Sequence, residues 1–293
     1  RQFDVEFMER VYKQKFEVIA CNFDEVPASV EASIPAGGHL AGNRIGFDAG
    51  GSDRKVSAVV NGEVIHSEEV VWFPKTNSDP DYHYQGILDS FRRAAEKMPS
   101  VDAIGVSSAG IYIDNEVRVA SLFIKVPQDE FDAKVVDMYI RAAKEYGDVP
   151  LTVANDGDVT ALAGSMSLKS GQVLGIAMGT SEAAGYVNKD GNLNGWLSEL
   201  AFVPVDYNKG AMVDEWSGDY GCGVKYFSQD GVIKLAGFAG IELDENASPA
   251  EKLKVVQGLM KEQDPRAREI YENIGTYLGY SIAYYSEFYD IKY

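Results

Sequence analysis

Apolar and polar positions along the first half of the chain follow strand and helix periods in turn. A short apolar stretch that begins at Arg44 predicts a strand that leads into a glycine-rich turn. Residues 55–60 follow with alternating apolar and polar side chains, which predicts a second strand. A turn at Asn61-Gly62 then begins a third predicted strand that ends at Val71. Helical spacing follows at 84–98 and 130–146, each before a buried apolar run, at 101–106 and 150–154. The pattern predicts an α/β lobe with the order β-β-β-α-β-α-β.

The second half of the chain predicts another α/β lobe that is richer in helix. An Ala-rich helix is expected at 157–168, a strand at 173–177, and a hairpin at 185–196 that turns through Asn188 to Gly191. Residues 198–240 are irregular, and helices are expected at 251–261 and 266–289. Ahead of both lobes, residues 3–16 have the spacing of a short amphipathic helix and 27–42 read as a linker. We therefore expect an N-terminal extension (1–43), a first lobe (44–157) and a second lobe (158–293).

The tip after the first strand reads Asp48-Ala-Gly50-Gly51-Ser52 and could bind an anion. Glycines in a hairpin tip allow backbone N–H groups to approach a phosphate closely, because no Cβ blocks the approach. Asp48 at the strand end would then hold a hydrated divalent cation that shares the phosphate charge. An ordinary glycine hairpin would have the same sequence, so this motif alone leaves both interpretations open.

Two further strand ends carry small or polar residues. The strand at 101–106 ends in Ser107-Ser108-Ala109-Gly110, and the strand at 150–154 ends in Asn155-Asp156. Ligands bind at the carboxyl ends of strands in open α/β sheets. A carboxylate in this position can accept a proton from a substrate hydroxyl during phosphoryl transfer, a role that Asp156 fits. Asn-Asp-Gly could instead simply cap the following helix.

These motifs together resemble those of a known family. The Asp48 motif resembles the first phosphate loop of the actin/hexokinase/Hsp70 ATPase superfamily. Residues 155–164 are similar to the Asn-Asp-Ala-Asn-x-x-Ala-x-Gly signature of its ROK sugar-kinase branch, and residues 175–185 are similar to the second phosphate loop. Order and spacing agree over residues 45–293. The resemblance implies a two-lobed, ribonuclease-H-like (actin/hexokinase-type) α/β fold with a cleft between the lobes.

The resemblance also implies an ATP- and Mg²⁺-dependent kinase of a sugar or sugar-like small molecule. Asp156 would be the general base, and Asp48 would hold Mg²⁺ through water. The implied substrate-binding residues are Asn155, Glu199, Ser108 and Gly110, and the residues that line the ATP phosphates are Gly50, Gly51, Ser52, Lys55, Gly179, Thr180 and Ser181.

The sequence departs from the family at several of its motifs. Glu182 follows Gly179-Thr180-Ser181 and would place a carboxylate near the polyphosphate. Phe202 and Val224 stand where the family has a His and a Glu that hold sugar hydroxyls. A buried hydroxyl left without a partner costs about 1–3 kcal/mol, so a substrate other than the usual hexose is expected. Of the family's zinc ligands only Cys222 remains, and one thiolate cannot make a tetrahedral site, so we expect no zinc.

Two alternatives to the kinase remain. A non-catalytic sugar-binding or regulatory protein of the same fold would tolerate the changes at Phe202 and Val224. An ATPase of the superfamily is the other alternative, although the retained Asn155-Asp156 argues against it. The tyrosine-rich stretch 277–293 has helical spacing, which favours packing or a homodimer contact over a cofactor wall.

Composition limits the partners and the compartment. The 27 basic and 45 acidic side chains give a net charge of −18, which repels nucleic acid and anionic membranes, and no basic helix-turn-helix is present. No apolar run reaches the ~20 residues needed to span a bilayer. The two cysteines suit a reducing compartment, so we expect a cytoplasmic protein. The start at Arg1 and the stop at Tyr293, where another strand would begin, suggest a fragment.

Overall fold

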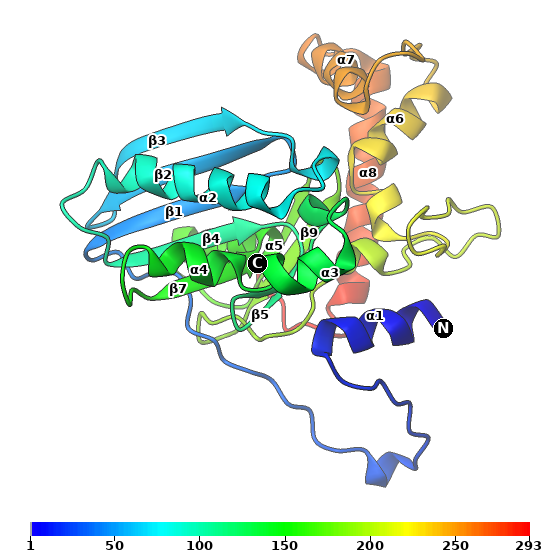
Figure 1. Cartoon of the computed structure of the whole chain (residues 1–293). Helices are drawn as coiled ribbons and strands as arrows, with labels where there is room; N and C mark the ends of the chain where they lie inside the picture. Colours follow the sequence, from blue (N-terminus) through cyan, green and yellow to red (C-terminus); the bar gives the residue numbers. More distant parts are fainter. Residues whose placement is uncertain (1) are drawn as a thin grey trace. The chain divides into compact units, whose positions relative to one another are not determined.

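The computed structural model describes residues 2–293, and the chain divides into two compact units (Figure 1). Unit 1 comprises Arg1–Val159 and unit 2 comprises Thr160–Tyr293. Each unit has its own hydrophobic core. The first unit is built on a sheet, whereas the second is mostly helical.

A five-stranded mixed sheet forms the centre of unit 1, in the order β3-β2-β1-β4-β7. The strands β1 (Asn43–Ala49), β2 (Asp53–Val60) and β3 (Glu63–Val71) form an antiparallel meander. The strands β4 (Ala103–Ser108) and β7 (Leu151–Asn155) extend it in parallel with β1. The three strands expected between residues 44 and 71, and the two buried strands expected at 101–106 and 150–154, are confirmed.

Helices cover one face of this sheet. Figure 1 shows α2 (Pro80–Ala95) and α4 (Met138–Lys144) lying side by side over the strands. Asp79 caps α2, because its carboxylate accepts a hydrogen bond of 2.9 Å from the Asp81 N–H. The apolar stripe of α2 meets the sheet in edge-to-face contacts such as Phe47 with Phe91, whose ring centroids are 5.5 Å apart.

The expected helix at 130–146 is wrong in detail, because the chain there is broken into three pieces. A turn, α3 (Gln128–Glu130), leads into a π-helical turn, η4 (Phe131–Val135), before α4 begins. The carbonyl of Val136 accepts a hydrogen bond of 2.9 Å from the Val117 N–H, which belongs to a neighbouring strand. This hydrogen bond ties the residue after the π-helical turn to that strand, at the point where the helix is interrupted.

That strand belongs to a small hairpin that the sequence analysis did not anticipate. The strands β5 (Ile111–Ile113) and β6 (Glu116–Val119) are joined by Asp114 and Asn115, both with positive φ (55° and 63°). Asp and Asn tolerate this conformation better than most other side chains. Asp-Asn between apolar residues is therefore the sequence signal that predicts this hairpin.

The N-terminal helix packs on unit 1. In α1 (Gln2–Tyr12) Val11 is completely buried, and the Arg10 guanidinium lies 5.6 Å from the centroid of the Phe131 ring. Just beyond the helix, Lys13 Nζ pairs with Glu116 Oε2 at 3.0 Å. The expected helix is confirmed. It is followed by a largely exposed segment that contains one short turn, η1 (Phe23–Glu25).

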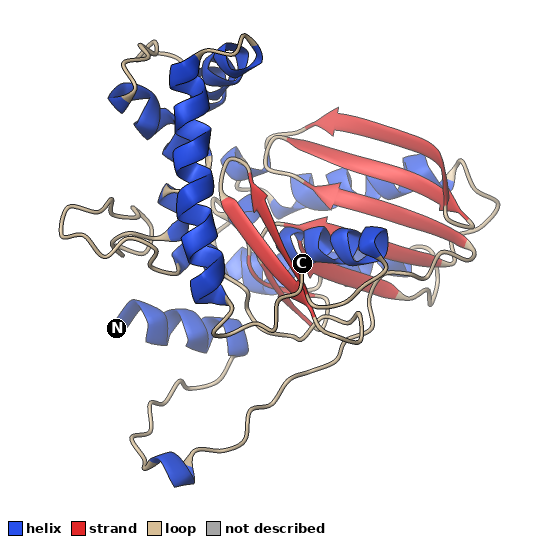
Figure 2. Ribbon diagram, turned by 180° about the vertical axis from the view of Figure 1, so that it is seen from behind, coloured by secondary structure: helices blue, strands red, loops and turns tan. Residues whose placement is uncertain are grey.

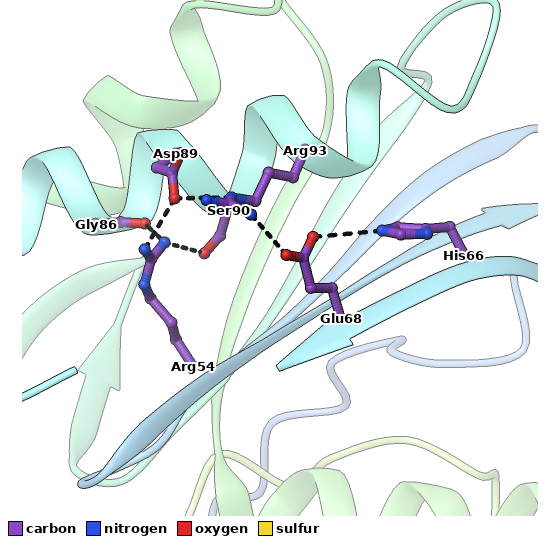
Figure 3. Close-up of polar contacts among 7 residues, drawn as sticks. All are labelled: Arg54, His66, Glu68, Gly86, Asp89, Ser90 and Arg93. Atoms are coloured by element: carbon purple, nitrogen blue, oxygen red, sulfur yellow. Dashed lines mark hydrogen bonds and ion pairs between the residues drawn. The ribbon is translucent and has the colours of Figure 1, made fainter. Parts of the chain in front are cut away.

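An ion-pair network joins α2 to the sheet (Figure 3). Arg54 on β2 is 9% exposed and donates to the Asp89 carboxylate (2.8 Å), the Ser90 hydroxyl (2.6 Å) and the Gly86 carbonyl. Arg93 bridges Asp89 (2.9 Å) and Glu68 (2.6 Å). The buried guanidinium therefore sits among three acceptors of one helix, which fixes how α2 lies on β2.

Unit 2 has one antiparallel strand pair, β8 (Val173–Met178) with β9 (Glu182–Val187), and a helix packs against this pair. The helix α5 (Asp156–Leu168) lies close to β8 at Gly175, where an added Cβ would be 2.6 Å from the Ala161 nitrogen. Only a glycine allows this approach. The expected hairpin at 185–196 reduces to a turn around Asn188 and a single bridge between Val187 and Leu193.

Three helices form the rest of unit 2. Figure 2 shows α6 (Gln229–Phe238) and α7 (Pro249–Lys261) packed beside the long helix α8 (Pro265–Tyr285). Ser248 and Glu251 form a capping box at the start of α7. The two later helices are confirmed and α6 was missed, because its few apolar residues are interrupted by Lys234 and Gly237 and follow an irregular segment. No helix among residues 2–293 has the length and apolar character needed to cross a membrane.

Replacing Arg54 by Met should destabilise unit 1. The substitution removes the donor of the buried Ser90 hydroxyl, the Gly86 carbonyl and Asp89, and a buried acceptor left unpaired costs about 1–3 kcal/mol of unfolding free energy. Arg93→Met is the matched control, since Arg93 pairs with the same carboxylate but its side chain is 40% exposed, and it should cost less than about 1 kcal/mol. Urea unfolding followed by far-UV circular dichroism measures both; equal losses would contradict the assignment.

Candidate active site

Two carboxylates stand at the same edge of the unit 1 sheet. Asp48 lies next to the end of β1 and pairs in register with Ser107 of β4, while Asp156 directly follows β7. Since β1, β4 and β7 are parallel, their carboxyl ends meet at one edge, and β1 and β7 are separated by about 10 Å at the usual strand spacing. The register thus brings Asp48 and Asp156, over a hundred positions apart in sequence, to one edge.

The charge of Asp156 is held in an unfavourable environment. Burial raises the pKa of Asp156 above its ordinary value, and the negative charge of Asp48 raises that pKa further. Its Oδ1 accepts a hydrogen bond of 3.1 Å from the Gly157 N–H, which offsets part of the effect. A carboxylate with a raised pKa is a better proton acceptor than an ordinary one. A hydrated divalent cation beside two such carboxylates would relieve their repulsion, so the donor set fits Mg²⁺.

Asn155 links the two strand-end loops. Its Nδ2 donates to the Gly110 carbonyl (2.7 Å), and its Oδ1 accepts from the Gly157 N–H (2.8 Å). The side chain therefore caps α5, as the simpler interpretation of Asn-Asp-Gly expected, and it also ties that helix to the loop after β4. Gly110 has φ of +134°, and an added Cβ would be 2.4 Å from the Val119 carbonyl oxygen, so only glycine fits there.

Ser108 lies beneath the loop and is not exposed. Its hydroxyl accepts a hydrogen bond from the Tyr112 hydroxyl at 2.7 Å and lies 3.4 Å from that of Tyr139. Burial raises the pKa of both phenols, that of Tyr139 to about 12. Side chains alternate along a strand, so Ser107, and not Ser108, shares the Asp48 side of the sheet. The sequence analysis named both serines and chose Ser108 as the substrate-binding residue, because the register that places Ser107 on the Asp48 side is not evident from Ser-Ser.

The first glycine tip is anchored by Trp72. The indole Nε1 donates to the Gly50 carbonyl (2.8 Å), and the Trp72 N–H donates to the Ser52 carbonyl (3.1 Å). Ser52 Oγ lies 3.2 Å from Asp53 Oδ2. An added Cβ on Gly50 would be 2.6 Å from the Asp53 carbonyl oxygen, so the tight tip requires glycine at that position.

Positive charge at this tip comes from two lysines, one of which the sequence did not suggest. Lys55 pairs with Asp53 at 3.0 Å, and this hydrogen bond raises the pKa of the ammonium. Lys75, in the turn η2 (Pro74–Thr76), lies against Gly51, whose added Cβ would be 3.0 Å from Lys75 Nζ. The buried His83 holds this turn, because its Nε2 is 3.0 Å from the Pro74 carbonyl oxygen. A lysine in an irregular loop carries no sequence signal for this placement.

The second glycine turn lies in unit 2, between β8 and β9. The Gly179 N–H donates to the Ser181 carbonyl (2.9 Å), which closes the turn, and Thr180 and Ser181 are exposed. The Gly179 carbonyl accepts a hydrogen bond of 2.9 Å from the N–H of Gln229, the first residue of α6. The turn is thus fixed at a helix N-terminus, where the helix dipole favours negative charge.

Glu182 points away from the exposed turn and into the protein. The residue is 4% exposed, and neither carboxylate oxygen has a hydrogen-bond partner within residues 2–293. An added Cβ on Gly223 would be 2.4 Å from Glu182 Oε2, which places the carboxyl against that glycine. Burial raises the pKa of Glu182 to about 8, so the group is largely neutral at pH 7. A neutral, inward-facing acid does not repel a phosphate at Thr180.

Two short turns of unit 2 carry the positions expected to recognise substrate. Glu199 precedes η5 (Leu200–Phe202), and Val224 lies in η6 (Gly223–Lys225). The turns lie side by side, because the Gly223 N–H donates to the Val203 carbonyl at 3.0 Å. Cys222 is buried. Within the part of the chain that the structure describes, no three His, Cys, Asp or Glu side chains are grouped as metal ligands would be.

Comparison with known proteins identifies the fold. The sequence matches no protein-family model and no curated protein. The structure resembles a ROK-family glucokinase from Streptomyces griseus in complex with glucose and AMPPNP, with 18% identity, 85% of this chain and 80% of that chain covered, and a TM-score of 0.63. A ROK hexokinase from Thermus thermophilus gives 16% identity, 85% and 79% coverage, and a TM-score of 0.59.

A regulator with this fold is equally similar. It is a ROK-family transcriptional regulator, a homolog of the E. coli MLC protein, with 17% identity, 86% of this chain and 64% of that chain covered, and a TM-score of 0.63. The chain therefore has the ROK fold, and the expected actin/hexokinase-type α/β class is confirmed. Identities this low establish the fold alone.

The stability of unit 2 should depend on pH through Glu182. The folded state keeps its proton up to about pH 8, whereas the unfolded chain releases it near 4.5, so the unfolding free energy falls as pH rises through this window and levels off above it. The loss between pH 5 and pH 8 should be roughly 3 kcal/mol. Glu182→Gln should flatten this slope, as measured by thermal unfolding at several pH values. Parallel curves for the variant and the parent protein would refute the assignment.

Proposed function

We propose that the protein transfers the γ-phosphoryl group of ATP to a hydroxyl of a sugar or sugar-like small molecule. The observation that supports this best is the pair of carboxylates at the edge of the unit 1 sheet, where Asp48 and burial together raise the pKa of Asp156. The similarity to sugar kinases such as the Streptomyces griseus glucokinase supports the same reaction class.

Asp156 acts as the general base in this proposal. A sugar hydroxyl is a weak nucleophile, and a carboxylate within hydrogen-bond reach accepts its proton as the bond to phosphorus forms. The raised pKa of Asp156 moves its basicity towards that of the developing alkoxide, which favours proton transfer. Asn155 positions this base, because the amide fixes the start of α5 against the Gly110 carbonyl. Glu199 would orient the substrate from unit 2.

The glycine turns would bind the phosphates. Unit 1 offers Gly50, Gly51 and Ser52 with the ammonium groups of Lys55 and Lys75, and unit 2 offers Gly179, Thr180 and Ser181 at the start of α6. These local donors matter because the chain carries a net charge of −18, which opposes the approach of a polyphosphate. Mg²⁺, held through water by Asp48, would neutralise phosphate charge when bound.

A sugar-binding regulatory protein without turnover is the second candidate. The similarity to the MLC homolog and the apolar residues at Phe202 and Val224 favour it. The two candidates differ in one measurement, since a regulator would be stabilised by its sugar without releasing ADP.

Changing Asp156 to Asn should abolish phosphoryl transfer while leaving binding intact. The amide keeps the shape but cannot accept the proton, so kcat should fall by about 10²–10⁴. ADP release over a panel of sugars and sugar derivatives measures this, with thermal stabilisation by the accepted sugar as the binding control. Unchanged turnover in the variant would remove Asp156 from the mechanism.

The pKa of Asp156 should respond to Asp48 in the metal-free protein. Because burial and the charge of Asp48 raise this pKa, Asp156 should titrate above the ordinary value of 3.8 when no Mg²⁺ is present. Asp48→Asn removes the like charge, so the pKa of Asp156 should fall. NMR titration of the Asp156 carboxyl in Mg²⁺-free buffer checks the shift; a pKa that stays in place in the variant would show that the two groups do not interact.

Lys75 should contribute to ATP binding. Replacement by Met removes a positive charge that lies against Gly51 and should raise the KM for ATP about fivefold, with a small change in kcat. Lys97→Met alters the net charge equally at an exposed position after α2 and serves as the control. Equal effects of both changes would indicate only long-range electrostatics.

A further inference from the structure

An exposed tryptophan in unit 2 is held in place by a well-built loop. Trp216 is 54% exposed, and its ring contacts that of Phe202 with centroids 5.2 Å apart and planes at 60°. Phe202 ends η5, the turn that follows Glu199. More than half of the Trp216 surface therefore remains accessible beside the ring of Phe202.

The backbone of the Trp216 loop is organised around a buried acid. Asp214 is 6% exposed, and its Oδ2 accepts hydrogen bonds from the N–H groups of Ser217 (2.7 Å) and Trp216 (3.2 Å). A bridge between Val213 and Tyr220 closes the base of the loop. These hydrogen bonds, all within so short a segment, fix its conformation.

An ion pair fixes the same loop to the neighbouring turn. The side chain of Lys225 is only 7% exposed. Its ammonium group donates to Glu215, the residue before Trp216, and to Asp230 at 3.3 Å. Lys225 directly follows Val224 in η6, and η6 lies beside η5 through the Gly223 to Val203 hydrogen bond. Trp216, Phe202 and Val224 are therefore carried by three segments that are bonded to one another.

We propose that Phe202 and Trp216 form an aromatic subsite, beside Glu199, that receives an apolar substituent on the sugar-like substrate. This inference rests on the proposed function, because it takes Glu199 to face that substrate. Aromatic faces bury apolar rings and C–H surfaces, whereas they cannot satisfy sugar hydroxyls. A planar aromatic substituent on the anomeric oxygen suits the site best, because it can stack on the exposed indole.

The charge around the subsite restricts the substituent further. Glu215 is 80% exposed on its side chain and adjoins Trp216, and Asp214 and Asp219 lie in the same loop. The single positive charge of Lys225 pairs with Glu215 and Asp230, so the charge around the loop stays negative, and a substituent with its own negative charge would be repelled. The substrate class is thus a neutral aryl or similarly apolar glycoside.

Binding of paired glycosides, without nucleotide, tests this inference. The 4-nitrophenyl and methyl glycosides of glucose, galactose and mannose, in both anomers, are compared by isothermal titration calorimetry. For at least one sugar, the 4-nitrophenyl glycoside should bind about three- to tenfold more tightly than its methyl partner. Its 4-carboxyphenyl analogue should bind more weakly. Equal affinities in every pair, or no binding of any glycoside, would overturn the proposal.

Variants test whether the aromatic pair causes the preference for the aryl glycoside. Trp216→Ala should remove the preference for the aryl glycoside while leaving methyl glycoside affinity unchanged, and Trp216→Phe should restore most of it. Phe238→Ala, which truncates an 85% exposed aromatic on α6, is the matched control and should retain the preference. Loss of both affinities together in a folded Trp216→Ala protein, or loss of neither, would overturn the proposal.

Turnover separates this inference from the kinase assignment. ADP release is measured with the tightest-binding glycoside in the parent protein and in Asp156→Asn. If the aryl preference depends on Trp216 but no ADP is released, the subsite stands and the kinase proposal fails. If ADP is released from sugars without any dependence on Trp216, the kinase proposal stands and the subsite is wrong.

Discussion

The candidate site depends on the parallel register of β1, β4 and β7. Asp48 pairs with Ser107, and Ala49 and Asn155 flank Ser108, so each strand delivers one short polar segment to the same edge. The hydrogen bond from Asn155 to the Gly110 carbonyl then joins two of these segments. A slip of one residue in β4 would exchange Ser107 and Ser108 between the faces of the sheet. It would also move the Gly110 carbonyl away from the Asn155 side chain. The placement of Asp156 at the same edge as Asp48 therefore relies on backbone pairing more than on its immediate neighbours.

Charge is the second constraint on the molecule. A chain with a net charge of −18 that is to hold a polyphosphate must supply positive potential locally and avoid negative charge at the contact points. In the proposed function, Lys55 and Lys75 would supply this potential at the first glycine turn. The second turn lies at a helix N-terminus, where the helix dipole favours negative charge. Glu182 satisfies the other condition, because burial keeps its carboxyl neutral and directs it inward. An acidic residue in a glycine turn is compatible with anion binding when it is protonated and faces away.

Much of this arrangement could be predicted from the sequence, because strands and glycine turns have local signals. The meander at 44–71, the strands that end at Ser108 and Asn155, and the position of Asp156 at a strand end all follow from periodicity and turn residues. The helix break at Val136 and the placement of Lys75 against Gly51 did not follow. Each depends on a contact between segments far apart in sequence, and such contacts override local propensity.

The departures from the family pattern become consistent when their surroundings are considered together. Considered alone, the changes at Phe202 and Val224 indicate that two contacts to sugar hydroxyls have been lost. In the structure, Phe202 meets an exposed Trp216, and the loop that carries the indole is held by Asp214 and by the buried ammonium of Lys225. Positions that had merely lost their contacts would not be expected to lie beside a loop held by side-chain-to-backbone hydrogen bonds of Asp214 and by the paired ammonium of Lys225. The apolar replacements and the anchored loop are better explained as one recognition surface with altered chemistry.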